Sequence, residues 1–591
     1  MSHSRIGRQF AVTTSVLGAI LAATFALPAS AANVTDARLE NADLEPHNWL
    51  LGFQNYASQR YSRLTNINQS NVDKLKVAFT VPLSDALRGR TTATLENHGL
   101  VDNGFMYIDA GDGVIMKIDV RSGTKGTVLW AANAQVDKAE NGRSRGVAMY
   151  MNNVIHNLTN GMVVSVNRDS GEFVWQQQIA RVVHPKGAGI DAEKTRENFT
   201  AAPLPADGKI LVGQSNGDAG TRGWLAALDP ATGKEIWRTY TVPNPGEPGF
   251  ETWKDDHNAW KTGGAALWTT GSYDPAQKLT IWGTAQPVPM FDPEFRPGDN
   301  LFSNAVVAFE MSTGKIKWYF QYTPNESWDY DEQGVHILVD APFGGQERKQ
   351  VVHFGRNGFF YQVDRTNGQF IHAHQYVDQV TWTAGIDQKT GKPVEYNPNL
   401  ALQTYIPATR WARADAMAKQ ACPHAAGAAR WQPMAVDPVK KVAYSAGEDG
   451  CTAMQIIPSI TLADGGIDEK GRAKAGTRAE ADLHGLLTAQ DLATGKQLAR
   501  VRQTYVNQSG ILATAGNLLF TATLDGAVTA HNPETLAELW RFETGVGIKS
   551  PPFTYAVNGK QYIAITAGAQ QPNVPDIGYR GWGAMLYVFS L

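Results

Sequence analysis

Two aspartates stand two residues apart in the aromatic block Trp328-Asp329-Tyr330-Asp331. A carboxylate can take the proton of a substrate hydroxyl that lies within hydrogen-bond reach, and carboxylate oxygens are also the donors that hard cations prefer. The purely structural alternative is that the second carboxylate caps a turn. The block is therefore a candidate for acid–base or metal chemistry, provided that the rest of the chain forms a frame that positions it.

A short repeat predicts that frame. Its pattern is an apolar strand end, a turn with Asp or Asn that finishes in Thr/Ser-Gly-Lys, and a tryptophan three residues later. The copies run over Ala227–Trp237 and Ala308–Trp318 and, more weakly, over Ile118–Trp130, Val166–Trp175, Val363–Ile371, Ala489–Leu498 and Ala530–Trp540. Each copy predicts two strands joined by a turn in which glycine supplies a positive φ. The tryptophans are expected to pack between units rather than to catalyse.

The uneven spacing of the copies is typical of β-propeller blades of about 40–50 residues with inserted loops. The sequence therefore predicts an all-β propeller. The best helix candidate is the short segment Thr409–Gln420, which we expect in an inserted loop.

The first 31 residues are typical of a secretory signal. Arg5 and Arg8 precede an apolar stretch that ends near residue 27, and an A-x-A cleavage site follows at 29–31. The alternative is a membrane anchor, but Thr and Ser interrupt the stretch and no stop-transfer charges follow it. We expect residues 1–31 to be cleaved and residues 32–591 to be a single exported, periplasmic domain without stable membrane insertion.

The charge and the cysteine content fit an exported protein. The formal net charge of −3 becomes −5 once the two leader arginines are removed, which argues against nucleic acid as a partner. Cys422 and Cys451 are the only cysteines, and no Cys-x-x-Cys-His motif is present. Covalently attached c-type haem is thereby excluded, and a single disulfide is expected in an oxidising compartment.

Beyond the repeat, several blocks resemble the alcohol and methanol dehydrogenases that depend on pyrroloquinoline quinone (PQQ). These blocks are Asn55–Ser62, Ile67–Val72, Arg296–Asn300, Tyr322–Asp331, Leu512–Gly516 and Thr523–Gly526. They occur in the family's order and cover about residues 45 to 590. The resemblance implies an eight-bladed β-propeller with tryptophan-docking repeats, PQQ as cofactor, and a disulfide between Cys422 and Cys451.

The resemblance also assigns cofactor contacts. PQQ is a flat o-quinone with three carboxylates, so its site needs stacking surfaces, cations and hydroxyl groups. Trp268 corresponds to the tryptophan that stacks under the quinone, Arg145 to the arginine that pairs with a PQQ carboxylate, and Arg356 to the cation near the reactive carbonyls. The remaining implied contacts are Thr200, Ser215, Asn216, Gly217 and, when a gap is allowed, Glu96.

A metal site is implied as well. Where the family binds Ca²⁺ through Glu, Asn and the catalytic Asp, this chain has Asp218, Gln286 and Asp329. The first ligand is one methylene shorter and the second one longer, but the oxygen donors are retained, so we expect a shifted and functional site. Asp331 matches a further ligand in relatives that use lanthanides, whose trivalent charge favours an extra carboxylate. Ca²⁺ and a lanthanide both remain open.

Two family features near the cofactor are absent. The positions of a vicinal cysteine pair hold Ala139 and Glu140, and a tryptophan position holds Gln508. Both changes remove bulk or rigidity, which suggests a more open pocket that accepts a larger, secondary alcohol.

The implied reaction is oxidation of an alcohol to an aldehyde or ketone. Asp329 takes the hydroxyl proton, the metal ion acts as Lewis acid, Arg356 stabilises developing negative charge, and hydride passes to PQQ. Since the chain has no haem motif, a soluble cytochrome c is the expected electron acceptor. Two alternatives remain: a PQQ-dependent aldehyde or sugar dehydrogenase, and a non-catalytic propeller scaffold of the cell envelope.

Overall fold

The computed structural model describes residues 33–83, 94–111, 113–134, 143–180, 197–256, 258–411, 419–456, 475–568 and 584–591. The expected leader and the positions Ala139 and Glu140 lie outside these ranges. Residues 33–591 form one compact unit. Among the described residues, helix is limited to α1 (Asp36–Glu40) and to single turns of 3-10 helix: η1 (Ala42–Leu44), η2 (Val72–Lys74), η4 (Gly217–Ala219), η5 (Phe250–Thr252), η6 (Ala259–Thr262) and η7 (Pro293–Phe295). None of the described helices is long and apolar enough to span a bilayer.

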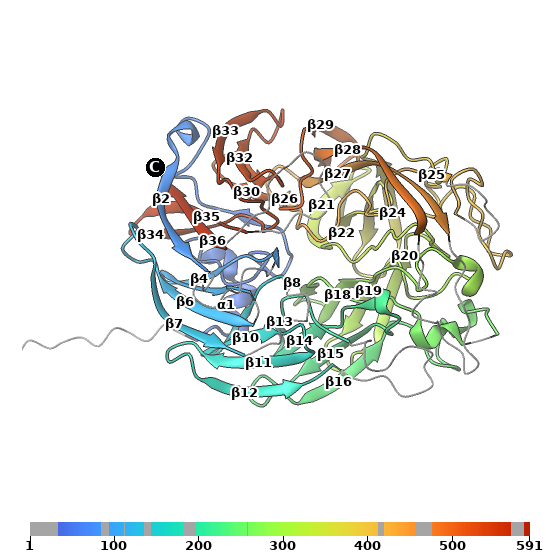
Figure 1. Ribbon diagram of the computed structural model, residues 1–591, viewed down its shortest axis with the longest axis horizontal. Coiled ribbons are helices and arrows are strands. Elements are labelled where there is room, and N and C mark those ends of the chain that lie inside the picture. The colour runs from blue at the N-terminus through green and yellow to red at the C-terminus, as the bar shows by residue number, and fades with distance from the viewer. Residues whose placement is uncertain are drawn as a thin grey trace, which may run out of the picture. The chain divides into compact units, whose positions relative to one another are not determined.

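The described part of the fold contains eight sheets of four or five strands, as predicted for an eight-bladed propeller, and one small two-stranded sheet. The first four sheets contain β4 (Leu100–Asp102), β5 (Phe105–Asp109), β6 (Val114–Asp119), β7 (Thr127–Asn133); β9 (Ala148–Tyr150), β10 (Asn153–Asn157), β11 (Met162–Asn167), β12 (Phe173–Gln178); β13 (Leu204–Ala206), β14 (Lys209–Gly213), β15 (Trp224–Leu228), β16 (Glu235–Tyr240); β17 (Ser272–Asp274), β18 (Leu279–Gly283), β19 (Ala305–Glu310) and β20 (Ile316–Gln321). Figure 1 shows the sheets following one another around a ring in chain order.

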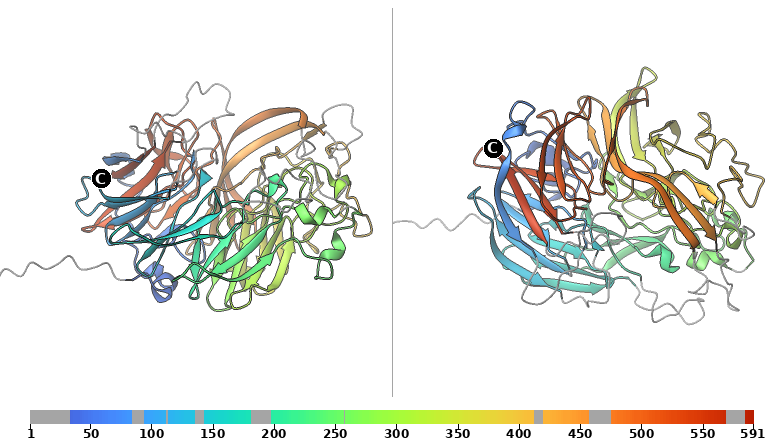
Figure 2. Two further views of the ribbon diagram at one scale, coloured as in Figure 1. Left: turned by 60° about the horizontal axis from the view of Figure 1, so that its bottom comes forward. Right: turned by 45° about the horizontal axis from the view of Figure 1, so that its top comes forward.

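The remaining sheets complete the ring. They contain β21 (Ile337–Phe343), β22 (Gln346–Phe354), β23 (Phe359–Asp364), β24 (Phe370–Gln375); β25 (Lys419–Ala421), β26 (Ala435–Asp437), β27 (Val442–Ile456), β28 (Ala475–Asp491), β29 (Gln497–Gln503); β1 (Tyr61–Ser62), β30 (Leu512–Thr514), β31 (Leu518–Ala522), β32 (Ala527–His531), β33 (Glu538–Glu543); β34 (Phe553–Val557), β35 (Lys560–Ala567), β36 (Met585–Ser590) and β2 (Lys76–Pro82). The strands β27 and β28, of 15 and 17 residues, can be followed in orange in Figure 2.

The ends of the chain close the ring. Strand β2 pairs antiparallel with the last strand, β36, and β1 pairs parallel with β30. Two sheets near the C-terminus therefore each contain a strand from near the N-terminus, which ties the two ends of the propeller together without a covalent bond.

The predicted turns form as expected. In the copy at Asp229, the carboxylate accepts hydrogen bonds from the backbone N–H groups of Ala231 and Thr232 at 3.1 and 2.9 Å. Gly233 has a φ of +71°, the left-handed conformation that glycine adopts without steric cost. The turn is thus determined by residues that lie within five positions of one another.

Each repeat tryptophan packs on the next repeat's turn glycine. A Cβ added at Gly171, Gly233 or Gly314 would lie 2.8, 2.5 or 2.4 Å from the indole of the preceding repeat. The indole N–H groups of Trp130, Trp175 and Trp237 donate to backbone carbonyls of the following sheet at 3.2, 3.0 and 3.1 Å. The tryptophans therefore join blades, as predicted.

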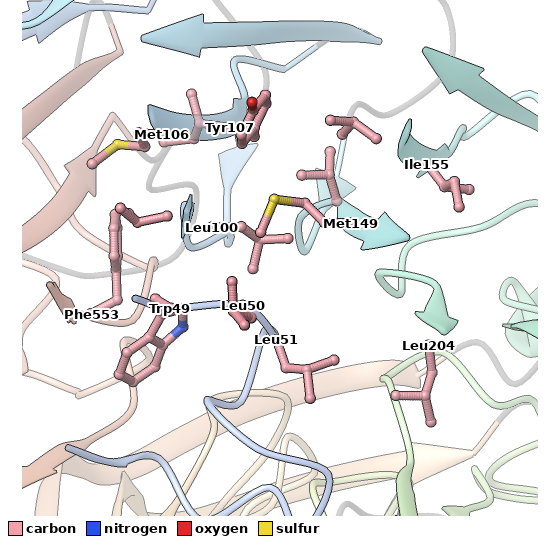
Figure 3. Packing of buried hydrophobic residues seen from close by; sticks show 14 of the residues in the cluster. Trp49, Leu50, Leu51, Leu100, Met106, Tyr107, Met149, Ile155, Leu204 and Phe553 are labelled. Atoms are coloured by element: carbon pink, nitrogen blue, oxygen red, sulfur yellow. The ribbon is translucent and has the colours of Figure 1, made fainter. Parts of the chain in front are cut away.

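The largest hydrophobic cluster joins the N-terminal segment to the first blades. Trp49, Leu50 and Leu51 lie among buried residues from four different sheets, including Leu100, Met149, Leu204 and Phe553 (Figure 3). Because this segment fills the space where sheets meet, it fixes the relative positions of the blades that present the site described below.

The predicted helix at Thr409–Gln420 is described only at its two ends, and neither end is helical. Within Thr409–Gln420, Thr409 lies in a turn and Lys419 begins strand β25, while residues 412–418 lie outside the described part. The alanine-rich segment suggested a helix by propensity, but its C-terminal end pairs with β27, so tertiary pairing decides the conformation of that end.

Cys422 and Cys451 form the expected disulfide, with a sequence separation of 29 residues. Replacing both with serine should lower the free energy of unfolding by about 3–4 kcal/mol, because the loop regains conformational freedom in the unfolded chain. Denaturant titration under oxidising conditions measures this, with thiol-reduced wild type as the matched control. An unchanged midpoint would show that the surrounding sheet alone holds this loop.

Candidate active site

The predicted site residues all occupy equivalent places in the fold. Each lies just before the first strand or just after the second strand of its sheet: Glu96, Arg145, Thr200, Ser215, Asn216, Gly217, Asp218, Trp268, Gln286, Asp329, Asp331 and Arg356. In an antiparallel sheet these two places are at the same end. Residues spread over more than 250 positions of sequence therefore gather at one end of the propeller.

A buried glutamate shapes the loop that carries the two aspartates. The side chain of Glu326, which is fully buried, accepts hydrogen bonds from the backbone N–H groups of Trp328 and of Tyr330, the latter at 2.9 Å. Asp329 between them has a φ of +68°, a conformation that Asp tolerates better than most residues. The loop thereby turns Asp329 toward open space, where its side chain keeps 22% of its exposure.

Oxygen donors converge at this loop. Asp331 accepts a hydrogen bond from the backbone N–H of Gln286 at 2.8 Å, and the side-chain amide of Gln286 donates to Asp218 at 2.6 Å. The guanidinium of Arg356 lies 2.5 Å from Asp331 and 3.5 Å from Asp329. The structure therefore brings the four predicted metal ligands and Arg356 into one cluster.

The carboxylates of this cluster hold protons more tightly than usual. Burial raises the pKa of Asp331 to about 6, against the opposing effect of Arg356. Burial also raises the pKa of Asp329 well above its ordinary value; Arg356 opposes this shift, and the negative charges of Asp331 and Asp218 add to it. Excess negative charge in a buried cluster is the situation that a bound cation relieves.

The pKa of Asp331 predicts a pH dependence of the metal-free protein. Between pH 4 and pH 6 the folded chain binds more protons at Asp331 than the unfolded chain, so this group destabilises the fold as the pH rises. Relative to an Asp331→Asn variant, metal-free wild type should lose up to about 3 kcal/mol across this range, and Ca²⁺ or a lanthanide should remove the loss. Denaturant unfolding at each pH tests this; parallel pH profiles of the two proteins would contradict it.

The second cluster forms a cradle for anionic and planar groups. The guanidinium of Arg145 lies 2.6 Å from Glu96, 2.6 Å from the Thr200 hydroxyl and 4.6 Å from the centre of the Trp268 ring. The two-stranded sheet of β3 (Thr94–Leu95) and β8 (Arg143–Ser144) aligns Glu96 beside Arg145. Thr200 and Trp268 are only partly buried, so both remain available to a ligand.

The segment after β14 links the two clusters. The hydroxyl of Ser215 lies 2.9 Å from that of Thr200, while Asp218, three residues later, bonds to Gln286. Asn216 and Gly217 stand between them. A Cβ at Gly217 would approach the Ala266 side chain to 3.2 Å, so glycine allows close contact between this segment and the chain that precedes Trp268.

Sequence reasoning missed three residues of the site. The guanidinium of Arg145 lies 5.6 Å from the Trp431 ring, which also has Arg430 and Lys549 at 4.7 and 5.7 Å. Trp431 thus lies near Arg145, as Trp268 does. The available signal was the adjacent pair Arg430-Trp431 before a strand, at the same place in its blade as the predicted residues.

Gln508 lies beside this group and is buried. Its amide donates to Glu448 at 3.0 Å, and Glu448 also lies 3.5 Å from Arg430 and 3.7 Å from His424. A polar network therefore occupies the region where the family's tryptophan was expected.

Comparisons with known proteins show which family the chain resembles. The PQQ family profile described as "Glucose/ethanol/alcohol dehydrogenase, beta-propeller domain" matches residues 49–378 and 482–563. The quinoprotein alcohol dehydrogenase PedH of Pseudomonas putida is 33% identical over 86% of this chain and 84% of its own length. The quinohemoprotein alcohol dehydrogenase of Comamonas testosteroni is 30% identical over 96% of this chain and 80% of its own length. The structure of a europium-containing methanol dehydrogenase superposes with a TM-score of 0.80 and 27% identity, covering 94% of this chain and all of that one.

Proposed function

The chain belongs to the PQQ-dependent alcohol dehydrogenases, and we propose that it oxidises an alcohol larger than methanol with Asp329 as the catalytic base. The observation that carries this proposal is the convergence of Asp218, Gln286, Asp329 and Asp331 beside Arg356. Membership of an enzyme family sets aside the alternative of a non-catalytic scaffold.

The donor set fits a hard metal ion. Three carboxylates and one amide offer oxygen ligands of the kind that Ca²⁺ and lanthanides prefer. The side-chain oxygen of Gln286 is buried and has no hydrogen-bond partner among the described residues, and a buried amide oxygen without a partner costs free energy that a cation would recover. We therefore propose Asp218, Gln286, Asp329 and Asp331 as the ligands of a Ca²⁺ or lanthanide ion.

The second cluster suits PQQ. Arg145 offers a guanidinium to a carboxylate, Thr200 and Ser215 offer hydroxyls, Trp268 offers a partly exposed ring, and Glu96 aligns Arg145. We propose these residues, with Asn216, Gly217 and Arg356, as the cofactor contacts, and we add Trp431 and Lys549 because both adjoin the same space.

The residues of the chain have defined parts in the reaction. When bound, PQQ accepts a hydride and the metal ion acts as a Lewis acid. Asp329 accepts the proton of the substrate hydroxyl at a carboxylate oxygen, which its partly exposed side chain presents to the substrate. Arg356 holds Asp331 at 2.5 Å and supplies positive charge beside Asp329, where it stabilises negative charge that develops during the reaction.

We propose that Gln508 lies at the wall of the substrate pocket, where a side chain smaller than tryptophan lets the enzyme accept larger, secondary alcohols. Its bond to Glu448 would make this wall polar. Gln508→Trp should lower kcat/KM for 2-butanol at least about tenfold relative to ethanol, since added bulk in a packed site excludes larger substrates. Equal loss for both alcohols would place Gln508 outside the substrate pocket; Gln508→Asn, which keeps the polar group, is the control.

The expected leader and the absence of a Cys-x-x-Cys-His motif support a proposal for the setting of the enzyme. We propose that residues 1–31 are removed on export, that residues 32–591 act in the periplasm as one PQQ-binding domain, and that a soluble cytochrome c receives the electrons. A stable complex with cytochrome c and faster reoxidation in its presence would support this acceptor; reduction of a membrane quinone alone would oppose it.

A substrate panel tests the function as a whole. The exported protein is reconstituted with PQQ and either Ca²⁺ or a lanthanide, and dye-linked oxidation of primary and secondary alcohols, aldehydes and sugars is measured. We expect alcohols to give the highest kcat/KM. Preference for aldehydes or sugars, or a strong preference for methanol over bulky alcohols, would overturn the proposed substrate class.

A further inference from the structure

We propose that Asp378, Asp449 and His484 form a second metal site, distinct from the site at Asp329, for a borderline divalent cation such as Zn²⁺. Asp378 follows strand β24, Asp449 lies on β27 and His484 lies on β28. One ligand atom from each residue falls within 4.8 Å of the others. The site joins two neighbouring blades and takes no part in the proposed alcohol oxidation.

The histidine is oriented as a metal ligand would be. Its Nδ1 lies 2.6 Å from the backbone carbonyl oxygen of Asp482, so Nδ1 carries the hydrogen and donates it. In the neutral imidazole, Nε2 is then left with a lone pair. Metal-binding histidines are held in the same way, because a hydrogen bond at one nitrogen fixes the tautomer and the direction of the other.

Nε2 of His484 lies close to a carboxylate. Nε2 lies 3.4 Å from Oδ2 of Asp378, yet it has no hydrogen-bond partner among the described residues, and the His484 side chain is 97% buried. A nitrogen lone pair and a carboxylate oxygen this close repel each other unless a proton or a metal ion lies between them, and the contact lacks the geometry of a hydrogen bond. A divalent ion bonded to both removes this conflict.

Hydrogen bonds and an ion pair orient the two carboxylates of the site. Asp449 is 1% exposed and accepts backbone hydrogen bonds from Gly450 at 2.8 Å and Asp378 at 2.6 Å, which fix its direction. Arg500 lies 2.5 Å from Oδ1 of Asp378 and leaves Oδ2 facing His484. One arginine against two carboxylates leaves a net negative charge at the site.

The donor types select the ion. One imidazole nitrogen with two carboxylate oxygens suits Zn²⁺ or a similar first-row ion better than Ca²⁺, which takes oxygen alone. Ligand bonds of about 2.0–2.2 Å require the widest separation in the cluster to shorten. Asp378, whose side chain is 39% exposed, has the freedom to make that movement, and water would complete the coordination.

Such an ion would stabilise the position of β27, a strand that also contributes to the region around Gln508. Glu448, which bonds to Gln508, immediately precedes Asp449, and Cys451 of the disulfide lies two residues beyond it. Gln379, next to Asp378, lies 3.7 Å from the sulfur of Cys451. The ion and the disulfide would together hold β27 against the chain that follows β24.

The test uses the full exported protein, loaded with PQQ and with excess Ca²⁺ or lanthanide to keep the catalytic site filled. Zn²⁺ is titrated by calorimetry, and bound zinc per chain is counted by elemental analysis after desalting. The variants are His484→Ala and Asp378→Asn; the second changes a partly exposed residue and should fold normally. His374→Ala, on β24 outside the cluster, is the matched control.

We expect about one zinc per wild-type chain, at least a tenfold weaker affinity in both site variants, and wild-type affinity in the control. Zinc should also raise the melting temperature of wild type and of His374→Ala but not of the site variants. Absence of zinc binding in wild type, or equal affinity in Asp378→Asn and wild type, would overturn the proposal.

Discussion

Asp329→Asn should lower kcat for alcohol oxidation by roughly 10²–10⁴-fold, the contribution typical of a general base, while the protein still binds PQQ. Asparagine keeps the size of the side chain but cannot accept the hydroxyl proton. It also tolerates the φ of +68° found at this position, whereas alanine there would add backbone strain of about 1–2 kcal/mol. Asparagine also keeps an oxygen that can bind the metal ion, so it separates the loss of the proton acceptor from a loss of structure.

Two readouts define the outcome for Asp329. Dye-linked turnover measures the chemical step, and the near-ultraviolet absorbance of the desalted protein measures retained PQQ. We expect PQQ to be retained, because the substitution leaves the proposed cofactor contacts at Arg145, Thr200 and Trp268 unchanged. Asp340→Asn, at a surface aspartate that is 63% exposed, is the control. Turnover near the wild-type level in Asp329→Asn would remove Asp329 from the mechanism, and loss of PQQ would mean that its role is mainly structural.

The fold could be predicted where its determinants are local. The turn at Asp229–Gly233 is specified by five consecutive residues, and Trp237 follows at a fixed distance to pack on Gly314. Such units repeat around the ring, so a few copies suffice to identify the architecture. The segment Thr409–Gln420 could not be predicted in the same way, because pairing with a strand more than thirty residues later decides its end.

The site could be predicted where single residues match the family, and much less where contacts are long-range. The register of Asp331 against the backbone of Gln286 joins two blades and has no signature in sequence. The same holds for Trp431, which comes beside Arg145 from a segment 286 positions away. Because Gln508 is smaller than the family's tryptophan, the sequence suggested a more open pocket. In the structure, Gln508 bonds to Glu448, and a polar network fills this region.

Asp331 should decide which metal ion the enzyme uses. The Coulomb attraction between a carboxylate ligand and a metal ion grows with the charge of the ion. Removing one carboxylate should therefore weaken binding of a trivalent lanthanide more than binding of Ca²⁺. We expect Asp331→Asn to reduce lanthanide affinity at least about a hundredfold and Ca²⁺ affinity about tenfold, that is, by roughly 2.8 and 1.4 kcal/mol. Calorimetric titration of the metal-free protein with each ion measures both values.

The comparison between ions separates the two possible roles of Asp331. As a ligand, it favours the trivalent ion, and asparagine keeps an oxygen that can accept the backbone hydrogen bond from Gln286. As a structural partner of Arg356 at 2.5 Å, its loss would displace Arg356 and weaken both ions equally. Equal losses would therefore contradict a metal-ligand role, whereas a larger loss for the lanthanide would identify Asp331 as the residue that adapts this site to a trivalent ion.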